Sequence, residues 1–187
     1  MWVTSMSKLI IFPTDTVYGI GCNIFDLPNI KKIYDIKHRS LDKPLACLCA
    51  NLEQIQSIAH INDRIEGLIQ RFLPGALTII VPAKEEVKAK LGYKTIGVRI
   101  PDSSFAIQIL LEHGPMLTTS VNDSGMPPIN EYEILRKKYA SLVDEIYPPC
   151  GNSSNLSSTV IAVEGEKIKV LREGSITISM INEVWNA

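Results

Sequence analysis

The chain has 187 residues, 45% of them hydrophobic and 6% aromatic, and its formal net charge is -1. This length suits one domain, 1–187, that buries a proper core. The charge argues against binding of a polyanion by the whole surface, so nucleic-acid binding would need a local basic patch. No apolar stretch approaches a membrane span, and 1–7 lacks a secretion signal. We therefore expect a cytoplasmic protein that does not enter membranes.

Short apolar runs and helical periodicity interleave in the first half of the chain. Residues 9–12 predict a buried strand, which Pro13 closes. Asp26 and Pro28 suit the cap and first turn of a helix that runs to Lys37. The next segments are predicted as a strand (45–49), two helices (52–59 and 64–72) and two strands (76–81 and 96–100).

The second half continues the same mixture. Asp102 is predicted to cap a helix that ends at Gly114. The remaining segments are predicted as a strand (116–120), a turn (122–125), a helix (132–139), a polar loop (148–157), a hairpin (159–163 with 168–171) and a final helix (176–185). This irregular interleaving predicts an α/β (or α+β) fold with a mixed, twisted sheet.

The four cysteines are Cys22, Cys47, Cys49 and Cys150. Cys47 and Cys49 are two apart in a predicted strand and so share a face. No histidine or further cysteine stands near them at ligand spacing, which favours buried, reduced thiols over a metal site.

Several enzyme signatures are missing. The sequence has no G-x-x-x-x-G-K-[ST] phosphate loop, no G-x-S-x-G and no H-E-x-x-H, and Gly19-Ile20-Gly21 lacks the third glycine of a dinucleotide fingerprint. A nucleotide would therefore need a different scaffold.

Two dense polar stretches instead indicate a site for an anion. Residues 13–19 read PTDTVYG, and residues 37–45 read KHRSLDKPL. Cationic donors that face hydroxyl groups on a tight backbone are suited to phosphates and carboxylates. Each stretch also has a purely structural interpretation. Thr14 and Thr16 could satisfy the backbone of their own turn, and a basic helix end could compensate the helix dipole.

Seven motifs occur in order: 13–21 PTDTVYGIG, 37–45 KHRSLDKPL, 73–78 LPGALT, 97–101 GVRIP, 119–125 TSVNDSG, 158–160 STV and 171–174 LREG. Together they resemble the YrdC/TsaC family, the threonylcarbamoyl-AMP synthases, over about 9–176. The resemblance implies an open sheet curled around a deep basic cavity. It also implies a reaction that joins L-threonine, bicarbonate (or CO2) and ATP with Mg2+ into threonylcarbamoyl-AMP and pyrophosphate. A tRNA-modifying transferase complex would take the product, and weak tRNA binding is left open.

The resemblance also suggests roles for single residues. Lys37 and Arg39 would act in catalysis by reaching the phosphates and the carbamate. The residues that would bind threonine are Thr16, Arg99, Thr118 and Ser158. Those that would bind ATP are Arg39, Lys43, Thr95, Ser120 and Arg172. No acidic cluster marks a dedicated metal site, so Mg2+ would arrive with ATP.

Alternatives remain at the level of residues and of the whole chain. Arg99 would be unexpected within a strand without a partner, and a salt bridge with an acidic neighbour is its structural alternative. Asn122 could serve only to shape the turn to Gly125. A non-catalytic RNA-binding module of the same fold is the main functional alternative. Carbamoyl-adenylate chemistry for metallocentre maturation is a third, against which the lack of accessory domains argues.

Overall fold

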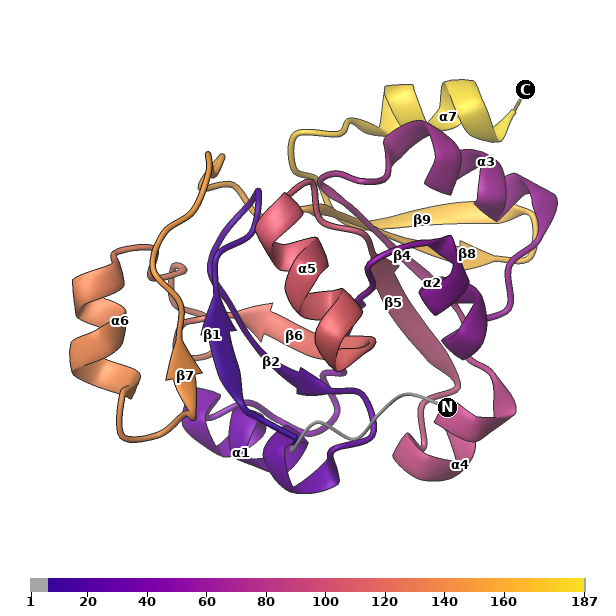
Figure 1. Cartoon of the computed structure of the whole chain (residues 1–187). Coiled ribbons are helices and arrows are strands. Elements are labelled where there is room, and N and C mark those ends of the chain that lie inside the picture. The colour runs from indigo at the N-terminus through magenta and orange to yellow at the C-terminus, as the bar shows by residue number, and fades with distance from the viewer. Residues whose placement is uncertain (1–6, 187) are drawn as a thin grey trace.

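The computed structural model describes residues 7–186, and one nine-stranded sheet organises them (Figure 1). Its strands are β1 (Ile10–Phe12), β2 (Gly19–Asn23), β3 (Ala46–Leu48), β4 (Leu77–Pro82), β5 (Thr95–Arg99), β6 (Met116–Ser120), β7 (Glu145–Ile146), β8 (Thr159–Glu164) and β9 (Lys167–Arg172). Their order across the sheet is β7-β1-β2-β6-β3-β5-β4-β8-β9. Three pairs are parallel, namely β1 with β7, β3 with β5 and β4 with β8, whereas the others are antiparallel. The expected mixed α/β sheet is confirmed.

Seven helices flank the described sheet: α1 (Leu27–Lys37), α2 (Leu52–Ile58), α3 (Asp63–Phe72), α4 (Glu85–Leu91), α5 (Ser104–His113), α6 (Tyr132–Tyr139) and α7 (Ile178–Trp185). The Asp26 carboxylate accepts a hydrogen bond from the Asn29 amide at the start of α1, as expected of a cap. The predicted cap of α5 is wrong by one residue. Ser103, not Asp102, has the extended backbone of a cap, and its hydroxyl accepts from the Ala106 amide.

Side-chain alternation along the strands gives the sheet two different faces. On one face, Cys47, Ile79, Val98 and Leu117 belong to the main hydrophobic core, which α1, α2, α3 and α7 cover. On the other face, α5 packs on Ile10, Phe12, Leu48 and Met116 in a smaller cluster. Because α5 covers only part of this second face, the remaining strands are free to line a cavity.

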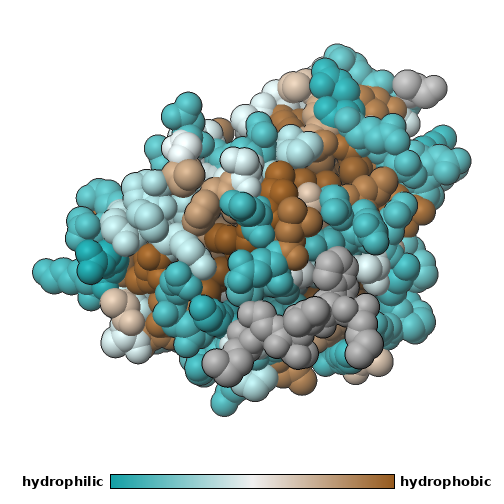
Figure 2. Space-filling model, in the orientation of Figure 1, coloured by the Kyte–Doolittle hydropathy of each residue, from teal (hydrophilic) through white to brown (hydrophobic). Residues whose placement is uncertain are grey.

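Figure 2 shows hydrophobic residues in the middle of the viewed face, around α5, and hydrophilic residues along its margins. Within residues 7–186, no helix is long and apolar enough to cross a membrane. Residues 1–6, on which part of the expectation about a secretion signal rests, lie outside the described residues.

Candidate active site

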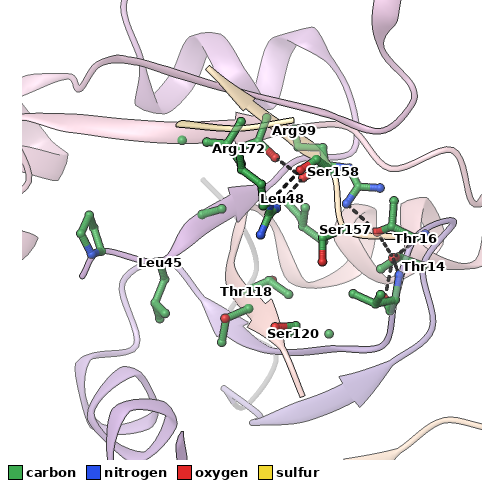
Figure 3. Close-up of a pocket in the computed structure, with 18 of the residues that line it drawn as sticks. Thr14, Thr16, Leu45, Leu48, Arg99, Thr118, Ser120, Ser157, Ser158 and Arg172 are labelled. Carbon is green, nitrogen blue, oxygen red and sulfur yellow. Dashed lines mark hydrogen bonds between the residues drawn. The ribbon is translucent and has the colours of Figure 1, made fainter. Parts of the chain in front are cut away.

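A cavity of about 330 Å³ opens on the α5 face of the sheet. Strand residues two apart line it, because they share a face: Thr118 with Ser120, Ala46 with Leu48, Thr95 with Gly97 and Arg99, and Thr78 with Ile80. Val160 of β8 and Ser158, just before that strand, also line it. Two loops complete the wall, 14–19 and the segment that holds Arg39, Pro44 and Leu45. Figure 3 shows hydroxyl side chains from several elements around this space.

Three arginines that are distant in the sequence meet in the cavity lining. Arg39 follows α1, Arg99 ends β5 and Arg172 ends β9. No carboxylate of the described residues joins them in the lining. Burial lowers the pKa of both Arg99 and Arg172, yet a guanidinium stays charged at neutral pH. The three guanidinium groups thus converge on one concave, hydroxyl-lined pocket, and an anion is the ligand that such a pocket favours.

Arg99 is held by three acceptors. Its Nη2 donates to Asp15 Oδ1 at 2.6 Å, its Nη1 to Thr16 Oγ1 at 2.9 Å and its Nε to the Gly75 carbonyl at 2.8 Å. The acidic partner that was only an alternative from the sequence is therefore present. One N–H on each terminal nitrogen has no acceptor among the described residues, so the guanidinium can still bind a carboxylate from the cavity side.

The two threonines of the 13–19 loop do different things. Thr14 Oγ1 donates to the Val17 carbonyl at 2.7 Å and accepts from the Thr16 and Val17 amides. Its side chain therefore satisfies its own turn, as the structural interpretation held. Thr16 Oγ1 accepts from Arg99, which places it beside the arginine predicted to share its ligand, although both threonines line the cavity.

Arg39 is fixed along one edge of its guanidinium. Nε donates to the Lys43 carbonyl at 2.9 Å, and Nη2 donates to the Pro44 carbonyl at 3.2 Å. Both N–H groups of Nη1 lack an acceptor among residues 7–186. The side chain is thus oriented before any ligand arrives, and it keeps donors for an anion.

Lys37 differs from the expectation that it reaches the ligand. It is 2% exposed and lies outside the cavity lining. Its Nζ donates to the carbonyls of Ser120 and Asn122 and to Asn122 Oδ1 at 3.1 Å, which uses all three ammonium hydrogens. Burial, reinforced by the Arg39 charge, lowers the pKa of Lys37 to about 8. The last turn of α1 directs this lysine at the loop after β6 rather than at the cavity.

Lys43 also lies outside the lining, and it is exposed. Only its backbone takes part in the site, because the Lys43 carbonyl accepts from Arg39 Nε and from the Tyr34 hydroxyl. The expected contact between its ammonium group and ATP stays a prediction, which the lining of the cavity does not support.

At the polar end of β6, Thr118 and Ser120 lie on the same face of the strand and both line the cavity. Asn122 is buried beyond the strand, where its Oδ1 accepts from Ser120 Oγ at 2.6 Å and from Lys37. Gly21 on β2 makes room for Thr118: a Cβ there would lie 2.6 Å from Thr118 Oγ1. Asn122 therefore organises Ser120 as well as shaping the turn.

Ser158 joins a hydroxyl pair on the opposite wall. Its Oγ lies 2.9 Å from Thr78 Oγ1 and accepts from Arg172 Nη2 at 3.3 Å, and its carbonyl accepts from Arg172 Nε at 2.9 Å (Figure 3). The sequence assigned no role to Thr78 or Asp15. Thr78 lies on the same face of β4 as Ile80, and both line the cavity, so the alternation of side chains along the strand could have predicted its position. Nothing local marks Asp15 as the partner of Arg99.

The cysteines fit the expectation with one exception. Cys22, Cys47 and Cys49 are buried in the main core, whereas Cys150 is exposed. Within residues 7–186, no group of three histidine, cysteine or carboxylate side chains could hold a metal ion.

The chain is similar in sequence to a known protein family and to several of its members. The Sua5/YciO/YrdC family model, described as telomere recombination, matches residues 3–174. A chain from Methanocaldococcus jannaschii is 33% identical over 93% of this chain and 83% of its own length. The threonylcarbamoyl-AMP synthase of Bacillus subtilis is 31% identical, with 95% of this chain matched to 53% of that protein.

Among solved structures, Pyrococcus abyssi Sua5 complexed with L-threonine superposes with a TM-score of 0.87 at 31% identity. This match covers 95% of the chain and 53% of Sua5. The chain thus spans about half the length of these Bacillus and Pyrococcus relatives. With the family match extending over nearly all of its residues, the chain belongs to the Sua5/YciO/YrdC family.

Proposed function

We propose that this chain is an enzyme, a threonylcarbamoyl-AMP synthase, which makes threonylcarbamoyl-AMP and pyrophosphate from L-threonine, CO2 or bicarbonate, and ATP. The observation that carries the proposal is the convergence of Arg39, Arg99 and Arg172 on one hydroxyl-lined cavity. It is supported by the names of the relatives, one of them bound to threonine.

The proposed reaction builds negative charge at two places. The threonine amine attacks the carbon of CO2, an N–C bond forms and a proton leaves, which gives a carbamate. A carbamate oxygen then attacks the α-phosphorus of ATP, and the bond from that phosphorus to the bridging oxygen breaks as pyrophosphate departs. This is nucleotidyl transfer, and preorganised cations and hydroxyl donors are what it requires.

The residues divide between the two substrates. Arg99 has one N–H on each terminal nitrogen for the threonine carboxylate, beside Thr16, Thr118 and Ser158. Arg39 and Arg172 would bind the phosphates, with Thr95 and Ser120 as further nucleotide contacts. Lys37 would act through the Ser120–Asn122 segment that it anchors. Lys43 has no direct role in this assignment.

Magnesium would enter with ATP. The cavity lining supplies hydroxyl and carbonyl oxygens but no carboxylate from the described residues, so the anionic ligands of the ion would be the phosphates of the nucleotide. The ion would neutralise phosphate charge when bound. We also propose that the product passes to a tRNA-modifying transferase in the cytoplasm.

Pyrophosphate release by the purified protein tests the assignment. Release should require threonine and bicarbonate together, and mass spectrometry should detect threonylcarbamoyl-AMP. Equal release without either substrate would refute the synthase. Arg99→Ala should raise the KM for threonine, whereas Arg172→Ala should raise the KM for ATP. No release at all, combined with strongly salt-dependent tRNA binding, would favour the RNA-binding alternative.

A further inference from the structure

A chain of hydrogen bonds runs beneath the loop that carries Arg39. The Tyr93 and Tyr34 hydroxyls lie 3.0 Å apart, the Tyr34 hydroxyl donates to the Lys43 carbonyl at 3.1 Å, and Arg39 Nε donates to the same carbonyl at 2.9 Å. Tyr34 is 5% exposed on α1, and Tyr93 is half-buried in the connection between α4 and β5. Neither tyrosine lines the cavity.

The direction of each bond follows from the number of hydrogens. A tyrosine hydroxyl has one hydrogen, and a carbonyl can only accept. The Tyr34 hydroxyl therefore donates its single hydrogen to the Lys43 carbonyl, so in the bond between the two tyrosines the Tyr93 hydroxyl must be the donor. The Lys43 carbonyl uses its two lone pairs on Tyr34 and Arg39. Burial, followed by the bond to Tyr93, raises the pKa of Tyr34 well above its usual value, which keeps this hydroxyl protonated at neutral pH.

The relay connects two parts of the cavity wall. At one end, it fixes the carbonyl that orients the Arg39 guanidinium, leaving Nη1 for a ligand. At the other end, Tyr93 lies two residues before Thr95, the first residue of β5, which lines the cavity. Hydrogen bonds in such a chain polarise and strengthen one another. A side chain that is ordered before binding also loses less entropy when the ligand arrives.

We propose that Tyr34 and Tyr93 are positioning residues, which hold Arg39 and its loop in the conformation that receives the phosphates of ATP. The identity of the ligand rests on the proposed function, whereas the ordering of the loop does not. Neither tyrosine touches substrate, so their loss should change nucleotide affinity while the chemistry and the threonine end of the cavity stay intact.

The test uses three phenylalanine variants that keep each ring. Tyr34→Phe removes both hydroxyl contacts, and Tyr93→Phe removes only the outer one. Tyr139→Phe is the matched control, because Tyr139 is 2% exposed on α6 and does not line the cavity. Hydrogen exchange of the segment 39–45 in the ligand-free protein is the first measurement, and the KM values for ATP and threonine are the second.

We expect faster exchange over 39–45 in Tyr34→Phe and a smaller increase in Tyr93→Phe. Losing hydrogen bonds worth about 1 kcal/mol each should raise the KM for ATP about 30-fold in Tyr34→Phe, which loses two, and about fivefold in Tyr93→Phe, which loses one, with little change in kcat or in the KM for threonine. The double variant should match Tyr34→Phe, because Tyr93 acts through Tyr34. Tyr139→Phe should behave as wild type.

Unchanged exchange over 39–45 in both single variants would overturn the relay, as would equal rises in the KM values for ATP and threonine. Absence of threonine-dependent pyrophosphate release in the wild-type protein would refute the proposed function instead. The exchange measurement would still decide whether the two tyrosines order the loop.

Discussion

Removal of Asp15 tests whether the cavity depends on a buried ion pair. Asp15 Oδ1 lies 2.6 Å from Arg99 Nη2, and the two side chains are 13% and 7% exposed. Asp15→Ala leaves the guanidinium in place without its counter-charge. Arg99 keeps its bonds to the Gly75 carbonyl and to Thr16 Oγ1. The substitution therefore isolates the charge partner from the rest of the arginine's contacts.

The expected loss of stability follows from this burial. Two charge centres about 4 Å apart interact by about 4 kcal/mol at an effective dielectric constant of about 20. Breaking a buried pair by removing one partner costs roughly 3–5 kcal/mol. Because two neutral acceptors remain for Arg99, we expect the lower end, about 3 kcal/mol. For a chain of this size that corresponds to a fall in Tm of about 6–12 °C.

Urea unfolding followed by circular dichroism measures this change, with an unchanged m-value as the sign of an intact native state. Asp123→Ala is the control, because the Asp123–Lys138 pair has a similar separation of 3.0 Å but side chains about 45% and 43% exposed. It should change stability far less than Asp15→Ala does, because solvent screens this exposed pair. Equal losses in the two variants would refute the reasoning. The double variant Asp15→Ala with Arg99→Met should be more stable than Asp15→Ala alone, because it removes the isolated buried charge.

Three further outcomes are expected. Lys37 has a pKa of about 8 in the folded chain against an ordinary 10.5, so the unfolded chain binds more protons between these pH values. Lys37 should therefore contribute a rise of about 3 kcal/mol to the free energy of unfolding across that window. The buried thiols of Cys22 and Cys47, whose pKa values are raised, act in the opposite direction, so urea titrations should show the contribution as the difference between wild type and Lys37→Met. Gly21→Ala would drive a Cβ against Thr118 Oγ1, so we expect a loss of about 1–3 kcal/mol and a higher KM for threonine; an unchanged KM would contradict this placement. Chelation of Mg2+ by EDTA should abolish pyrophosphate release, and activity that persists in EDTA would count against entry of the ion with ATP.

Much of the fold could be predicted from local patterns. The helix predicted over 132–139 is α6 with the same bounds, and the strand at 116–120 is β6. The sequence pattern missed β2 because Gly19 and Gly21 have low strand propensity. Those glycines are explained only by the neighbouring strand, where the space they leave is taken by Thr118. The short α4 and the two-residue β7 also went unpredicted, because segments of 7 and 2 residues carry little periodic signal.

The candidate site, like the fold, was predicted in part from the sequence and decided in part by tertiary packing. The order of the motifs along the chain was enough to indicate the family and to mark Arg39, Arg99 and Arg172, because each stands in a recognisable local run. Which partner each cation meets was decided by tertiary packing alone. Asp15 lies 84 residues from Arg99, and the carbonyls that hold Lys37 lie 83 and 85 residues away. No local pattern records such distant pairings, since they arise only when the sheet brings the ends of separate strands together.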